Sequence, residues 1–186
     1  MILASGSPRR GEILSMLGYD YIRDVADCDE NTDGLTAREA VGVLAERKSA
    51  AVAGRHPGEW VLGSDTLVTL DGRPIGKPAD PDDAKRMLRA LSGRTHTVYT
   101  GVCLMRDGES EVFTEEARVT FYPLSQEQIE RYVATGEPLD KAGAYGIQGK
   151  GAALVEKIEG DFFTVTGLPA GALAQRLARR QILPKR

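Results

Sequence analysis

The apolar residues of this chain form short runs and alternating segments that are typical of β-strands. Residues 60–70 (WVLGSDTLVTL) carry the strongest such pattern, and we expect an interruption at their Gly-Ser-Asp sequence, where the alternation stops. Asp65 would then lie at the end of a strand. Two long strands are expected on either side of Asp107 and Gly108, a typical hairpin turn. The predicted strands cover residues 2–4, 19–25, 60–70, 95–105, 111–124 and 153–158.

Helices are expected where a capping residue precedes apolar positions spaced three and four apart. Thr36 with Glu39, and Ser125 with Gln128, have the spacing of a capping box. Three further helices are predicted to start at prolines, a common first helical residue, namely Pro8, Pro81 and Pro169. Strands, hairpins and helices are therefore interleaved, which predicts an α/β protein with a mixed sheet and not a purely parallel one.

Composition limits the classes of partner. The chain has 186 residues, which suits one domain or one domain in two lobes. Its net charge of −3 argues against nucleic acid or an anionic membrane as a partner. The two cysteines lie far apart in sequence and form no CxxC pair, so a disulfide framework is not expected. This cysteine usage fits a reducing cytosol. No signal peptide or membrane-spanning stretch is recognisable, so we expect a cytoplasmic protein.

The first candidate site is the start of the helix at Pro8. A strand followed by small residues and a helix N-terminus exposes backbone N–H groups that can bind an anion. Arg9 and Arg10 could add charge-assisted hydrogen bonds to phosphate oxygens. The alternative is a pair of arginines on a solvated helix surface.

Two carboxylates and two lysines are further candidates. Asp65 could bind a divalent metal ion or act as a base, with Glu30 of the acidic loop as a second carboxylate. The alternatives are an aspartate that organises a turn and a solvated loop charge. Lys48 and Lys77 would singly be surface cations, but together with the two arginines they make a set of four cations suited to a triphosphate.

A glycine-rich segment at residues 136–151 (GEPLDKAGAYGIQGKG) is expected to be a loop. Glycines allow a backbone to approach a ligand closely, and Gln148 offers both a donor and an acceptor for the edge of a nucleobase. The alternative is a mobile surface loop. The glycines do not match a dinucleotide-binding or P-loop motif.

These segments together resemble the Maf family, the nucleoside triphosphate pyrophosphatases that are also linked to septum formation in bacteria. The matching stretches are LASGSPRRGEIL, GSDTLV, GKPADPDDAKRMLRALSGRTHTVYTGV, GEPLDKAGAYGIQGKGA and IEGDFFTVTGLP, which follow in order over nearly the whole chain. One departure is Ser64, because the dTTP/UTP group of this family often has alanine at the position before the acid.

The resemblance implies a role for each matching residue. Asp65 is implied as the proton acceptor. Arg9, Thr66 and Gln148 correspond to positions tied to substrate choice, and their identities are those of the dTTP/UTP group; a sister group acting on 7-methyl-GTP has Trp, Gln and Glu there. Other polar positions of the family's cleft correspond to Ser5, Arg10, Glu30, Lys48 and Lys77.

The resemblance also implies the fold, the activity and the cofactor. The expected fold is a single domain over residues 1–186, with an elongated mixed sheet, flanking helices and two lobes around a cleft, similar to inosine triphosphate pyrophosphatases. The expected reaction is hydrolysis of dTTP and UTP to the monophosphate and pyrophosphate, a house-cleaning activity. Mg²⁺ or Mn²⁺ is expected at Asp65 and Glu30, and a homodimer is implied. The alternative is a non-enzymatic, nucleotide-sensing regulator of septum formation.

Overall fold

The computed structural model describes residues 1–185 and divides the chain into two compact units. The first unit contains Met1–Asp65, Thr100–Glu115 and Gly167–Arg186, and the second contains Thr66–Tyr99 and Glu116–Thr166. Three of the four boundaries fall within long strands, and the fourth follows a short helix.

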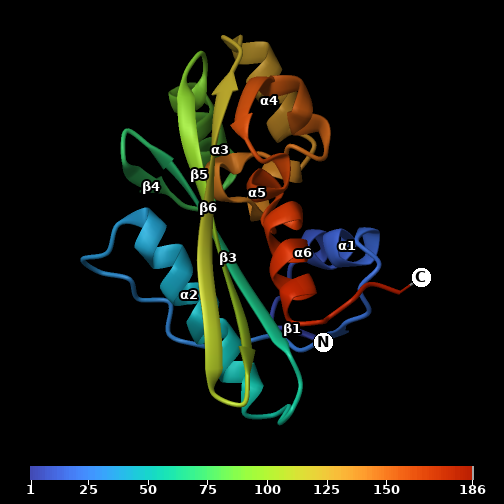
Figure 1. The fold of residues 1–186 in the computed structure, drawn as a ribbon. Coiled ribbons are helices and arrows are strands. Elements are labelled where there is room, and N and C mark those ends of the chain that lie inside the picture. The colour runs from blue at the N-terminus through green and yellow to red at the C-terminus, as the bar shows by residue number, and fades with distance from the viewer. Residues whose placement is uncertain (186) are drawn as a thin grey trace. The chain divides into compact units, whose positions relative to one another are not determined.

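The sheet has seven strands and is mixed, as the sequence predicted (Figure 1). The order of hydrogen-bonded strands is β2-β1-β3-β5-β6-β7, with β4 paired to β3. β1 pairs in parallel with β2 and β3, whereas the β3–β4 and β6–β7 pairs are antiparallel. The strands are β1 (Ile2–Leu3), β2 (Ile22–Arg23), β3 (Val61–Leu70), β4 (Arg73–Ile75), β5 (Thr95–Arg106), β6 (Glu109–Phe121) and β7 (Val155–Gly160).

Helices start at Pro8, at Pro81 and after both predicted capping boxes, whereas Pro169 is the N-cap of the last helix and not its first residue. Both capping boxes form, with Thr36 and Ser125 as the N-caps. One short helix, α5, was not predicted; the Asp161 carboxylate accepts hydrogen bonds at its start. In the part of the chain described, no helix is long and apolar enough to cross a membrane. The helices are α1 (Pro8–Met16), α2 (Ala37–Ala53), α3 (Pro81–Leu91), α4 (Gln126–Val133), α5 (Phe162–Thr166) and α6 (Ala170–Arg179).

The first unit is built on a close approach between α2 and the sheet. A Cβ atom at Gly63 of β3 would overlap the carbonyl oxygen of Ala45 and lie 2.5 Å from Ser49 Oγ, both on α2. A Cβ atom at Gly101 of β5 would overlap the carbonyl oxygen of Val41. Glycine at these two positions lets the helix backbone lie directly on the strands, a recognised use of glycine inside a strand.

This packing corrects the predicted interruption of the strand at residues 60–70. β3 runs from Val61 to Leu70 without a break, and Asp65 lies within the strand and not at its end. The alternation stops because Gly63 and Ser64 are both buried. Gly63 lies under α2, and Ser64 lies on the other face of the strand. A change in hydrophobic pattern therefore marked a helix contact, which periodicity alone does not distinguish from a strand end.

The second unit has its own apolar core, formed by α3, α4, the sheet and the glycine-rich segment. An aromatic group lies in it: the rings of His96, Phe121 and Tyr145 make edge-to-face contacts with centroids 4.8 to 5.3 Å apart. His96 is 2% exposed, and its Nε2 atom lies 2.8 Å from the Tyr145 hydroxyl. Burial lowers the pKa of His96 from its usual 6.5 to about 4, so the ring is neutral at pH 7.

We expect His96 to make the folded protein sensitive to acid. The unfolded chain takes up a proton on this imidazole below pH 6.5, whereas the folded protein resists it down to about pH 4. The free energy of unfolding should therefore fall across that window, by up to about 3 kcal/mol from this group. Urea unfolding at pH 7 and pH 4.5 measures the effect, with His96→Gln as the non-titrating control. Equal pH slopes for the two proteins would contradict it.

Candidate active site

In the first unit, Lys48 of α2 joins the two predicted carboxylates. Its Nζ atom lies 2.6 Å from Asp65 Oδ1 and 2.9 Å from Glu30 Oε1. The side chains of Lys48 and Asp65 are 15% and 14% exposed, while Glu30 is 66% exposed. Burial lowers the pKa of Lys48, but the two carboxylates raise it by more, and the net shift is upward. The ammonium is therefore firmly protonated at neutral pH.

The close approach of α2 to β3 explains why this cluster forms. Gly63 and Asp65 are two residues apart on a strand, so they face the same side of the sheet. Lys48 follows Ala45 by three residues and lies on the same side of the helix. With the Ala45 carbonyl resting on Gly63, the lysine side chain reaches Asp65 directly. Glycine on the strand thus positions the lysine against the acid.

Arg10 lies in a second cluster of the first unit, at the start of α1. Its Nε donates to the Gly167 carbonyl at 2.9 Å and its Nη1 donates to Ser5 Oγ at 2.9 Å. Ser64 Oγ donates to the same carbonyl at 3.0 Å, which gives the serine at this position a structural contact. Burial lowers the pKa of Arg10 to about 10, with Asp65 raising it and Arg9 lowering it. The guanidinium remains charged at neutral pH.

The start of α1 matches the predicted helix N-terminus in its location. Ser7 occupies the N-cap position but its side chain makes no capping bond. Ser5 Oγ instead accepts from Ser7 N at 3.2 Å. Arg9 is half-buried on the first turn of this helix.

In the second unit, the other predicted residues come from separate elements. Thr66 lies on β3 and is half-buried, and Lys77 is exposed in the segment that follows β4. Gln148 is exposed within the glycine-rich segment. That segment is more ordered than the predicted loop, because it contains 3₁₀ helices at Glu137–Asp140, Ala142–Ala144 and Lys150–Leu154.

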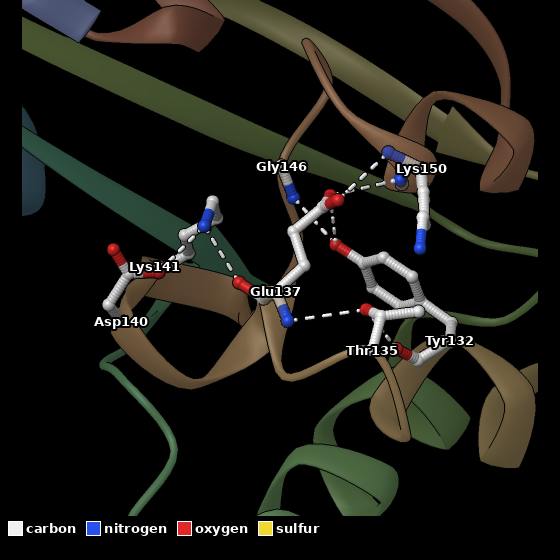
Figure 2. Close-up of polar contacts among 8 residues, drawn as sticks. Tyr132, Thr135, Glu137, Asp140, Lys141, Gly146 and Lys150 are labelled. Atoms are coloured by element: carbon white, nitrogen blue, oxygen red, sulfur yellow. Dashed lines mark hydrogen bonds and ion pairs between the residues drawn. The ribbon is translucent and has the colours of Figure 1, made fainter. Parts of the chain in front are cut away.

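Sequence reasoning missed Glu137, which lies at the centre of the polar contacts of this segment (Figure 2). Its carboxylate accepts hydrogen bonds from Tyr132, Lys150 N and Gly151 N. The only signal in the sequence was an acid that precedes several glycines, and this pattern also occurs in solvated loops. Tyr132 lies on α4, and no local sequence pattern indicates that its hydroxyl bonds Glu137.

Asp65 and Glu30 are the two predicted metal ligands. Within residues 1–185 no group of three or more His, Cys, Asp or Glu side chains is arranged to hold a metal ion. The two carboxylates nevertheless lie close together, because both pair with the Lys48 ammonium. Such a pair fits Mg²⁺, which is commonly held by one or two carboxylates together with substrate phosphates. Any such site would depend on the substrate for its remaining ligands.

Taken together, these features define an α/β protein whose mixed sheet carries a half-buried acid–lysine pair beside a charged helix N-terminus. A family model described as Maf-like protein matches residues 1–180. The chain belongs to the Maf family.

Similar proteins agree with this assignment. The chain is 47% identical to a dTTP/UTP pyrophosphatase of Shouchella clausii, covering 98% of this chain and 96% of the relative. It is 51% identical to a dTTP/UTP pyrophosphatase of Symbiobacterium thermophilum, covering 96% and 93%. Among solved structures, the Ham1 protein of Staphylococcus aureus is similar, with a TM-score of 0.54 and 17% identity over 97% of this chain and 98% of that one. This likeness confirms the mixed α/β fold.

We expect Arg10→Lys to destabilise the protein although the charge is kept. A lysine ammonium is a single point donor and cannot bond the Gly167 carbonyl and Ser5 Oγ in the way a guanidinium does. The loss should be about 1–3 kcal/mol in the free energy of unfolding, measured by urea denaturation. The neighbouring Arg9→Lys is the matched control and should change it by no more than about 0.5 kcal/mol. Equal effects of the two changes would argue against this anchoring contact.

Proposed function

We propose that this protein is a pyrophosphatase for dTTP and UTP. Water attacks the α-phosphorus, the bond to the oxygen bridging the α- and β-phosphates breaks, and a nucleoside monophosphate, pyrophosphate and a proton are released. The observation that carries the proposal is the half-buried Asp65–Lys48 pair, within a family whose similar members are named for this activity. The biological role is the removal of unwanted nucleotides.

The cationic residues hold the phosphate chain. Arg10 keeps its charge while half-buried, so its attraction for an anion is screened less than that of a fully exposed cation. Ser5 Oγ accepts from both Ser7 N and Arg10, which leaves its hydroxyl hydrogen to donate to a phosphate oxygen. Arg9, Lys48 and Lys77 supply the further positive charges that a triphosphate requires.

Asp65 accepts the proton of the attacking water. In the structure this carboxylate is bonded to the Lys48 ammonium, 2.6 Å away. A triphosphate offers Lys48 a more highly charged partner, so substrate binding draws the lysine toward phosphate and releases Asp65 for water.

Asp65 and Glu30 would hold a divalent cation, Mg²⁺ or Mn²⁺. When bound there, such a cation would supply charge neutralisation for the phosphates. Glu30 is exposed and lies on the loop before α2, so it can adjust to a ligand at little cost.

Gln148 selects the base, with Thr66 and Arg9 as the other residues of the selecting set. A 4-oxo pyrimidine presents an acceptor, an N–H donor and another acceptor along its edge. The side-chain amide of Gln148 can donate to the 4-oxo group and accept from the N–H. Cytosine reverses both positions and is disfavoured. The 5-methyl group that separates dTTP from UTP is worth only about 1 kcal/mol, so both are accepted.

The cellular setting follows from this activity. We place the enzyme in the cytoplasm, where its nucleotide substrates are. A homodimer is part of the same proposal, through the family resemblance, and light scattering of the purified protein tests it.

The proposed activity is tested by incubating the purified protein with dTTP, UTP and CTP, with and without Mg²⁺ or Mn²⁺. Monophosphate and pyrophosphate are the expected products. Asp65→Asn should lower kcat by about 10²- to 10⁴-fold with little loss of nucleotide binding, because the base is removed at constant size. Asp33→Asn, at an exposed acid of the preceding loop, is the control and should keep the activity. Nucleotide binding without release of pyrophosphate would favour a nucleotide-sensing regulator instead.

Gln148→Glu should shift selectivity from UTP toward CTP. A carboxylate can no longer donate to the 4-oxo group but can accept from the 4-amino group of cytosine. The ratio of kcat/KM for UTP over CTP should fall by about 10- to 100-fold, the range of one bidentate base contact. An unchanged ratio would remove Gln148 from base selection.

A further inference from the structure

The Glu137 carboxylate receives three hydrogen bonds within the second unit (Figure 2). The Tyr132 hydroxyl donates to Oε1 at 2.9 Å, Gly151 N donates to Oε1 at 3.1 Å, and Lys150 N donates to Oε2 at 2.9 Å. Two of these donors are consecutive backbone amides. Hydrogen bonds to an ionised carboxylate are stronger than those between neutral groups. The carboxylate therefore fixes the backbone at Lys150 and Gly151, whose amides donate to it.

The same pair of side chains also binds the other side of Gln148. Gly146 N donates to the Tyr132 hydroxyl at 2.9 Å, and that hydroxyl in turn donates to Glu137. The backbone is thus held two residues before Gln148, and again two and three residues after it. Gln148 itself is exposed, so its own backbone position is set by these neighbours.

The glycines of the segment serve this arrangement. A Cβ atom at Gly149 would lie 2.5 Å from Glu137 Oε2, and one at Gly151 would lie 2.7 Å from the Tyr132 hydroxyl oxygen. Both distances are too short for real carbon atoms. The sequence suggested that these glycines allow approach to a ligand, whereas the structure shows that they allow approach to Glu137 and Tyr132.

Electrostatics keep the pair in the required protonation states. Burial raises the pKa of Glu137, but the amides of Lys150 and Gly151 and the Tyr132 hydroxyl lower it by more, so the group is ionised at neutral pH. Burial and Glu137 raise the pKa of Tyr132, so its hydroxyl keeps the proton that it donates. Lys141 also faces this site, with its Nζ donating to the Glu137 carbonyl at 2.7 Å and to Asp140 at 2.6 Å.

We propose that Glu137, acting with Tyr132, is a positioning residue that holds Gln148 in the one backbone conformation in which it distinguishes bases. This rests on the proposed role of Gln148 in base selection. Glu137 does not touch the nucleotide; it acts through residues 146–151. Loss of the carboxylate should therefore weaken discrimination between bases more than it weakens the chemical step.

The test is Glu137→Gln, which keeps size but replaces one acceptor oxygen with a donor that opposes a backbone N–H. Steady-state kinetics with UTP and CTP should show an about 10-fold fall in the UTP/CTP ratio of kcat/KM, since small misplacements of a binding group have effects of this size or larger. The change should appear mainly in KM for UTP, with kcat within about two-fold. Tyr132→Phe, which removes the shared hydroxyl, should lower the ratio in the same direction.

A double-mutant cycle shows whether Glu137 acts through Gln148. In a Gln148→Ala background, Glu137→Gln should leave the UTP/CTP ratio unchanged, because the group being positioned is gone. Val98→Ala is the matched control for lost stability: it shortens a buried β5 side chain of the same core and should keep the wild-type ratio.

The outcomes separate this proposal from the one on which it rests. If Gln148→Ala keeps the wild-type ratio, the base-selecting role of Gln148 is wrong. If Gln148→Ala changes the ratio while folded Glu137→Gln and Tyr132→Phe both keep it, the positioning role is wrong. An equal loss of activity on UTP and CTP would likewise overturn it in favour of a purely structural role. Should Glu137→Gln fail to fold, Tyr132→Phe alone decides.

Discussion

The contact between the backbone of α2 and β3 at Gly63 is the constraint on which the acid–lysine pair depends. Because no Cβ atom separates them, the Ala45 carbonyl rests on the strand, and Lys48 three residues later reaches Asp65. Any larger residue at Gly63 would push the helix outward and lengthen a 2.6 Å contact. The close packing of these two backbones therefore decides how the Lys48 and Asp65 charges are arranged.

The second unit uses glycine in the same way. Glu137 can bond two consecutive amides only because Gly149 and Gly151 leave space for its carboxylate and for Tyr132. In both units a charged side chain is positioned by glycines on the facing backbone, which leave the space that a Cβ atom would otherwise fill. The acid–lysine pair and the proposed base-reading segment thus both depend on glycines in the backbone opposite.

Local signals predicted much of the fold and failed where distant contacts decide. Both capping boxes form as expected because their hydrogen bonds lie within four residues. The strand at residues 60–70 was wrongly expected to break at Asp65, because burial under α2 changes the hydrophobic pattern in the same way as a strand end. Glu137 was missed since its partners come from α4 and from residues thirteen and fourteen positions away.

The sequence by itself determined the fold class, most of the elements in their order and the family, and it predicted a set of residues for acting on a triphosphate. Periodicity, capping and ordered motifs are local properties, so they can be recognised along the chain. Only the tertiary structure decided that Lys48 bridges Asp65 and Glu30, that Arg10 is anchored to Ser5 and Gly167, and which side chains hold Gln148's segment. Most of these contacts join residues far apart in sequence, and their geometry depends on how closely backbones pack.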